Sequence, residues 1–233
     1  MCCPEDRPRR RRRQRHGSLQ PHAHRDTGGH ESVIHEGGVQ WMTAGSGLEH
    51  EEVSPHEFLE RGGPLEILQL WINLPSRLKM TTPAYTGLQN SQIPSFTLDG
   101  ERVRVNLIAG SWEDRRGPIE SLTGVHMTTI ELRPGGAVEL PVPAGRNVFL
   151  YVVREEIRIG GHPAPQFHLA ELQDDGDSIS VESGDDSLIL FGHVAPIGEP
   201  VVAHGPFVMN TREEILEAIR DYQAGKFRGA IEL

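Results

Sequence analysis

The sequence has few cysteines, no long apolar run and little of the periodicity of long amphipathic helices. Its two cysteines, Cys2 and Cys3, are adjacent, so we expect neither a disulfide framework nor a structural zinc site, which needs spaced Cys or Cys/His pairs. No apolar run approaches the ~20 residues of a membrane span, and the first residues lack the apolar core of a secretory signal. A G-x-S-x-G elbow and a phosphate-binding loop are also missing. We therefore expect no membrane association, no serine hydrolase and no nucleotide-binding fold.

Positive charge is scarce outside the first 20 residues. The formal charge is −10 at pH 7, and residues 1–20 hold seven arginines against Glu5 and Asp6, which leaves −15 on the rest. A duplex-binding surface needs clustered cations that displace counterions, so we expect no direct contact with nucleic acid. An acidic body suits a cytoplasmic protein. We also expect the protein to be a monomer. Residues 1–20 have the composition of a disordered tail.

Glycine and proline are abundant, with 26 and 17 residues, and they separate short apolar runs. This spacing predicts an all-β protein whose strands are joined by tight turns. At 233 residues the chain is long enough for two domains, predicted at 21–117 and 118–233. The clearest expected strands are a central one at Leu65–Pro75, an alternating one at 102–108, and a hairpin with its tip at 26–29.

One helix is expected, at the end of the chain. Thr211 is a suitable N-cap, and Glu214, three residues later, completes a capping box. Ile215, Ile219 and Tyr222 then share one helical face, and Gly225 is expected to end the helix.

His50 and Glu52 are the first candidates for a chemical role. Their i, i+2 spacing puts both side chains on one face of a strand, and nitrogen with oxygen donors suits iron, manganese, copper, nickel or zinc. His22 and His24 share this spacing, so two facing strands would bring four ligands together. His30, His35 and His56 are further candidates. On the residues alone, two exposed polar groups beside a turn and two solvated histidines remain the alternative.

Several long runs resemble the pirin family: VQWMTAGSGLEHEE, LQLWINLPSRLKMTTPAY, LTGVHMTTIELRPGGAVELPVPAGRNVFLYVV, LILFGHVAPIGEPVVAHGPFVMNTREEI and DYQAGKF. The resemblance extends from about Ala23 to the end. It implies two tandem cupin barrels with one metal, typically iron, in the first. In the family a His-x-His pair and a later His-x-Glu pair hold the metal. His50 and Glu52 stand where the later pair belongs, after the turn Thr43-Ala44-Gly45-Ser46-Gly47.

The beginning of the chain departs from the family pattern. The segment His24-Arg25-Asp26-Thr27 resembles a hairpin tip that follows the His-x-His pair, so His24 matches the hairpin histidine. We therefore expect the family pair and the opening strands to be missing, residues 1 to about 20 not to be family sequence, and the first barrel to be incomplete. An open edge in that barrel would weaken metal binding and favour aggregation.

The resemblance implies two functions. One is oxidation of a flavonol-like substrate of the quercetin 2,3-dioxygenase type, with Glu52 as ligand or base and mononuclear iron or another divalent metal as cofactor. The other is a metal- or redox-sensitive regulator that binds a transcription factor or metabolic enzyme. An inactive truncated pirin scaffold without metal is the third possibility.

Overall fold

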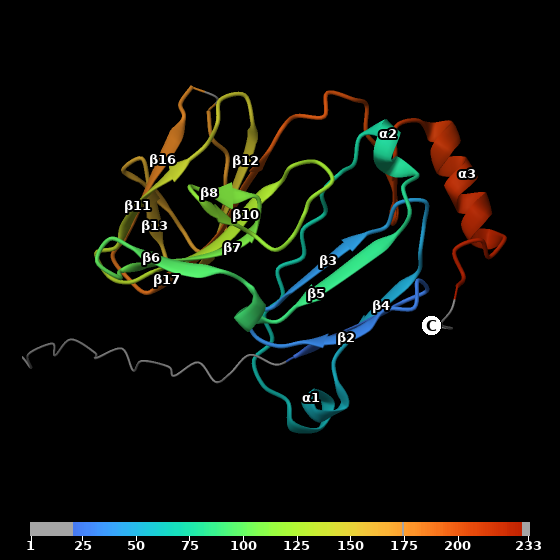
Figure 1. Cartoon of the computed structure of the whole chain (residues 1–233), viewed down its shortest axis with the longest axis horizontal. Coiled ribbons are helices and arrows are strands. Elements are labelled where there is room, and N and C mark those ends of the chain that lie inside the picture. The colour runs from blue at the N-terminus through green and yellow to red at the C-terminus, as the bar shows by residue number, and fades with distance from the viewer. Residues whose placement is uncertain (1–20, 174, 230–233) are drawn as a thin grey trace, which may run out of the picture.

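The computed structural model describes residues 21–173 and 175–229, and β-strands predominate in them (Figure 1). The predicted disordered tail, residues 1–20, lies outside the described part. Within that part, no helix combines the length and apolarity needed to cross a bilayer.

The first half of the fold, residues 22–88, forms two small antiparallel sheets and two short helices. The three-stranded sheet has the order β2-β1-β4, and β3 pairs separately with β5. These elements are β1 (His22–Asp26), β2 (Glu31–Ile34), β3 (Val39–Thr43), β4 (His50–Val53), α1 (His56–Arg61), α2 (Ser76–Lys79) and β5 (Ala84–Leu88). The predicted hairpin is confirmed, since β1 and β2 pair across residues 27–30.

The second half of the fold, which begins with β6 at Ser95, is a sandwich of a six-stranded and a four-stranded sheet. The larger sheet, in spatial order, contains β15 (Leu169–Ala170), β12 (Asn147–Arg154), β17 (Ser187–Val194), β10 (His126–Leu132), β7 (Val103–Ala109) and β6 (Ser95–Leu98). The smaller contains β11 (Ala137–Pro141), β16 (Ser178–Ser183), β13 (Ile157–Ile159) and β14 (His162–Ala164). Besides the C-terminal helix, the remaining elements are η1 (Asn90–Gln92), β8 (Ser111–Trp112), β9 (Arg115–Arg116), β18 (Val202–His204) and β19 (Phe207–Met209).

Two apolar clusters lie on opposite faces of the six-stranded sheet. One fills the sandwich and includes Val105 of β7 and Leu140 of β11, both fully buried, as the alternation along each strand requires. The other contains Met127 and Leu190, and Val39 and Trp41 of the first half pack against it. The second face of the six-stranded sheet is therefore buried where Met127 and Leu190 lie and exposed at Arg104 and Glu131, and the second cluster joins the two halves.

Strands β6 and β7 precede residue 117, yet both belong to the six-stranded sheet. The strand expected at residues 102–108 is confirmed as β7, with the register Val105 to Ile130 of β10. The larger sheet therefore takes strands from both sides of residue 117, and the domain boundary at that position stays a prediction.

The strand expected at Leu65–Pro75 is wrong. The chain has no strand there and passes without regular structure from α1 to α2. Leu65, Leu68 and Trp71 are 44%, 38% and 64% exposed, so apolar side chains at both odd and even positions of this segment reach solvent. An apolar run of this kind becomes a central strand only with a ladder on each side, and the described residues provide none.

The C-terminal helix is confirmed as α3 (Arg212–Gln223). Thr211 Oγ1 accepts a hydrogen bond from the Glu214 amide, and the Glu214 carboxylate accepts one from the Thr211 amide, which completes the predicted capping box. After α3 the chain returns to the first half, where the Thr27 hydroxyl donates to the Phe227 carbonyl at 2.7 Å. The helix therefore lies on the side of the first half, near α2 (Figure 1).

Replacing Thr211 by alanine is expected to destabilise α3 by about 1 kcal/mol, because the Glu214 amide loses its acceptor. Amide hydrogen exchange along 212–223 would measure the change, and Thr211→Ser, which keeps the hydroxyl, is the control. Equal exchange in the alanine and serine variants would show that the capping box does not stabilise the helix.

Candidate metal centre

The turn at residues 43–47 directs the chain from β3 toward β4. Gly45 has φ +52°, a left-handed conformation that disfavours larger residues. A Cβ at this position would overlap the carbonyl oxygen of Thr81, which accepts a hydrogen bond from the Ser46 amide at 2.8 Å. The turn is thus held against the segment before β5, and β4 begins three residues after it ends.

The pairing of β1 with β4 puts the candidate residues on one face. His24 lies directly opposite Glu52, and Asp26 lies opposite His50. Because side chains two residues apart on a strand share a face, all four of these side chains project to the same side of the ladder.

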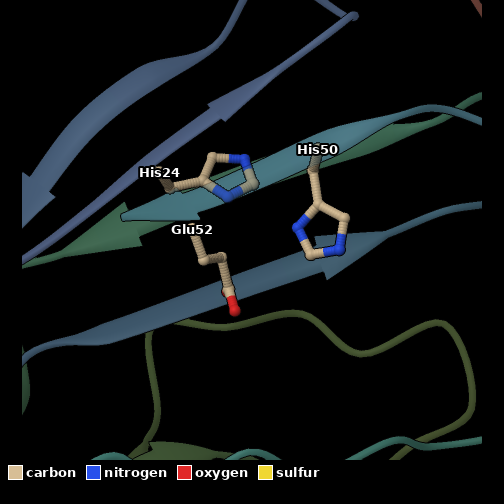
Figure 2. Close-up of side chains that lie close together, drawn as sticks. All are labelled: His24, His50 and Glu52. Carbon is tan, nitrogen blue, oxygen red and sulfur yellow. The ribbon is translucent and has the colours of Figure 1, made fainter. Parts of the chain in front are cut away.

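His24, His50 and Glu52 converge on one point, as Figure 2 shows. One ligand atom from each residue lies within 4.8 Å of the other two. His24 is 1% exposed, whereas His50 and Glu52 are exposed. An ion held here would be anchored on the buried side and would keep coordination positions open on the solvent side.

His22 lies beside this group. Its Nε2 is 3.9 Å from Glu52 Oε2, and the same nitrogen is buried and has no hydrogen-bond partner among the described residues. The structure thus brings three of the four predicted site residues together across the β1–β4 ladder and places His22 beside them. His35 and His56 are not part of the group that the described residues form.

Three neighbours of the group were not predicted as site residues. Tyr85 stacks on the His24 ring, with centroids 4.3 Å apart and planes 8° from parallel, and its hydroxyl is hydrogen-bonded to Ser32. Asp26 Oδ2 is 3.1 Å from His24 Nε2, and Gln69 donates its amide to Glu52 Oε2 at 3.0 Å. Asp26 could have been found from its i, i+2 spacing to His24. The other two depend on strand pairing and on the irregular course of residues 63–75.

The pKa values of two of these neighbours are shifted. Burial alone would raise the pKa of Asp26, but hydrogen bonds from His24 and from the amide and ring of His30 lower it below the usual range. Burial raises the pKa of Tyr85 above its usual value. Asp26 is therefore an anion, and Tyr85 a neutral phenol, at neutral pH.

The residues fit a transition-metal ion. Two imidazoles with a carboxylate form a borderline donor set that suits iron, nickel or zinc. Nδ1 of His24 and Nε2 of His22 are buried nitrogens without a partner among the described residues, and an unpaired buried nitrogen is costly unless it binds a ligand.

Comparison with known proteins identifies family models that match both parts of the chain. Two family models match the chain, Pirin over residues 17–72 and Pirin C-terminal cupin domain over residues 127–228. Human pirin is 37% identical over 209 residues, which cover 88% of this chain and 70% of human pirin.

Solved structures agree. A quercetin 2,3-dioxygenase from Acinetobacter baumannii superposes with a TM-score of 0.87 at 34% identity, over 92% of this chain and 75% of that one. A bacterial pirin from Escherichia coli in complex with nickel(II) shares the fold, with a TM-score of 0.58 at 22% identity over 78% of this chain and 71% of that one. The predicted fold class, tandem cupin barrels with a C-terminal helix and a partial first barrel, is confirmed.

Proposed function

Because the chain belongs to the pirin family, we propose that it binds one transition-metal ion through His24, His50 and Glu52. We further propose that it oxidises a flavonol-like substrate in a reaction of the quercetin 2,3-dioxygenase type. The observation that carries the metal site is the convergence of these three side chains within 4.8 Å. The substrate class follows from the likeness to the quercetin 2,3-dioxygenase of Acinetobacter baumannii.

The choice of metal follows from the donor set and the relatives. Family resemblance favours iron, and the nickel(II) complex of the Escherichia coli pirin makes nickel the second choice. We propose His22 as a fourth ligand, since its free Nε2 lies 3.9 Å from the Glu52 carboxylate.

Each side chain has a distinct part in the proposed reaction. When bound, the metal would polarise the hydroxyl oxygens of the substrate and mediate its reaction with dioxygen. Glu52 lies on the exposed side of the group, where its carboxylate takes the proton of a substrate hydroxyl. Gln69 restrains one oxygen of that carboxylate, and the Tyr85 ring holds His24 by stacking.

Metal content measured by plasma mass spectrometry tests the metal site. We expect about one ion per chain in the wild-type protein and a near-complete loss in His50→Ala, because an exposed ligand is removed without disturbing the core. His35→Ala, a histidine outside the group, is the matched control and should keep its metal. Metal near zero in the wild-type protein would make the chain a metal-free pirin scaffold.

Quercetin turnover in dioxygen-saturated buffer tests the activity. For Glu52→Gln we expect turnover to fall on the order of 100-fold, because the amide cannot accept the substrate proton. The metal content of the variant separates loss of the base from loss of the ion. Turnover that is unchanged in a metal-loaded Glu52→Gln would exclude Glu52 as the base.

A regulatory function is the second candidate, and the exposed apolar segment at residues 65–71 favours it. Leu65, Ile67 and Trp71 present apolar surface, as a protein-binding surface does, on the segment whose Gln69 contacts Glu52. A regulator would bind its partner in the Glu52→Gln variant as well as in the wild type, whereas an enzyme would show metal-dependent turnover without a partner.

A further inference from the structure

Asp26 is a buried carboxylate to which the proposed chemistry gives no part. Its side chain is 1% exposed, and it shares one face of β1 with His24. Oδ2 lies 3.1 Å from Nε2 of the His24 ring. His24 is the buried member of the metal group. A carboxylate in contact with its ring can therefore control which ring nitrogen faces the metal.

The contact determines which nitrogen of His24 is free. The oxygens of a carboxylate accept hydrogen bonds, so at the 3.1 Å contact Nε2 of His24 carries the proton and donates to Asp26 Oδ2. In a neutral imidazole the other nitrogen, Nδ1, then has the free electron pair. Nδ1 is buried and has no hydrogen-bond partner among the described residues.

Both the carboxylate and the ring are fixed from other sides. The amide and the ring Nδ1 of His30 both contact Asp26 Oδ1, at 3.1 and 3.0 Å. Tyr85 covers one face of the His24 ring. Neither partner in the His24–Asp26 contact can turn away without breaking further interactions, so the free Nδ1 keeps its orientation.

We propose that Asp26 is a positioning residue for the metal: it holds His24 in the Nε2–H tautomer, so that His24 binds through Nδ1. The inference rests on the metal site of the proposed function and adds to it the ligand atom and the residue that selects this atom. It also gives the hairpin histidine, which does not belong to the His-x-His pair of the family, a way to act as a ligand. Carboxylates that accept the second N–H of a ligating histidine commonly have this effect.

The tautomer can be measured without metal. Long-range ¹H–¹⁵N spectra of the metal-free wild-type protein should show His24 protonated at Nε2 and unprotonated at Nδ1. In Asp26→Asn the amide can donate to Nε2, so the Nδ1–H form should gain population. A wild-type His24 that carries its proton on Nδ1 would overturn the proposal, whether or not any variant folds.

Metal affinity is the second measurement, with Ni²⁺ titrated against a chromophoric chelator. We expect Asp26→Asn to weaken binding by roughly 10- to 100-fold. The matched control is His30→Gln, which removes a ring donor from the same carboxylate but leaves the His24 contact, and it should bind within about threefold of the wild type. Asp26→Asn that binds as tightly as the wild type would overturn the role of Asp26.

The design separates this inference from the proposed function. If His50→Ala loses the metal and Asp26→Asn does not, the metal site stands and the inference alone fails. If the wild-type protein binds no Ni²⁺ or Fe²⁺, the proposed function fails, and the metal role of Asp26 fails with it even where the Nε2–H tautomer is observed.

Discussion

Lowering the pH from 7 to 4 is expected to reduce the free energy of unfolding by about 3 kcal/mol through His193. Burial, followed by the neighbouring His126 and Arg146, lowers the pKa of His193 from 6.5 to about 4. His193 is 7% exposed on β17, and its ring stacks on that of His126 with centroids 4.6 Å apart. Nε of Arg146 donates to Nδ1 of His193 at 2.7 Å, so the folded protein holds this histidine neutral.

The direction of the effect follows from the two pKa values. Between pH 6.5 and about 4, His193 is protonated in the unfolded chain and neutral in the folded chain. The contribution is complete above pH 6.5 and is lost as the pH falls to about 4. Burial also lowers the pKa of His126, which adds to the loss. The pKa values of Asp26, Asp99 and Glu199 are lowered as well, but the usual pKa values of these carboxyls are 3.8 and 4.5, so their contribution is retained down to about pH 4.5 and is lost below it.

Urea unfolding at several pH values between 7 and 4 measures this effect. His193→Gln, whose amide oxygen can still accept from Arg146, should show a much smaller slope of unfolding free energy with pH. His56→Gln, on the exposed surface of α1, is the control and should match the wild type. A variant at position 193 with the wild-type slope would show that the acid sensitivity arises elsewhere.

The strands that could be predicted are those in which apolar and polar residues alternate, because the alternation shows which face of the strand is buried. Along β7, Val103, Val105 and Leu107 are buried at every second residue, so the sequence shows which face meets the core. Leu65–Pro75 has the composition of a buried strand, but strand formation needs a neighbour, and composition does not report whether one is there. This is why the prediction at that segment failed.

The candidate site also has a part that could be predicted from the sequence and a part that could not. The spacing of His50 and Glu52, and of His22 and His24, is local, and each pair was recognised from the sequence. The convergence of the two pairs depends on the register in which β1 meets β4, which spacing alone does not give. The stacking of Tyr85 on His24 joins residues 61 positions apart, and the bond from Gln69 to Glu52 comes from a segment without regular structure. Nothing in the local sequence marks either contact.

Gly45→Ala is expected to lower the free energy of unfolding by about 3 kcal/mol and to reduce metal content. A left-handed alanine costs about 1–2 kcal/mol, and forcing a methyl group into a filled space typically adds about 1–3 kcal/mol. At position 45 the methyl group would collide with the carbonyl oxygen of Thr81, a backbone atom that cannot rotate away. Since the turn leads into β4, its displacement would move His50 away from His24, and the metal should be lost together with stability.

Gly160→Ala separates the cost of the left-handed backbone from the cost of the collision with Thr81. Gly160 has φ +54°, close to the value at Gly45, but a Cβ there would meet no atom within 4 Å. It should therefore cost only the backbone term, about 1 kcal/mol, and leave the metal in place. Chemical unfolding and metal analysis of both variants give the comparison. If the two glycines cost the same, contact with Thr81 does not hold the turn. If Gly45→Ala is destabilised but keeps its metal, the position of β4 does not depend on this turn.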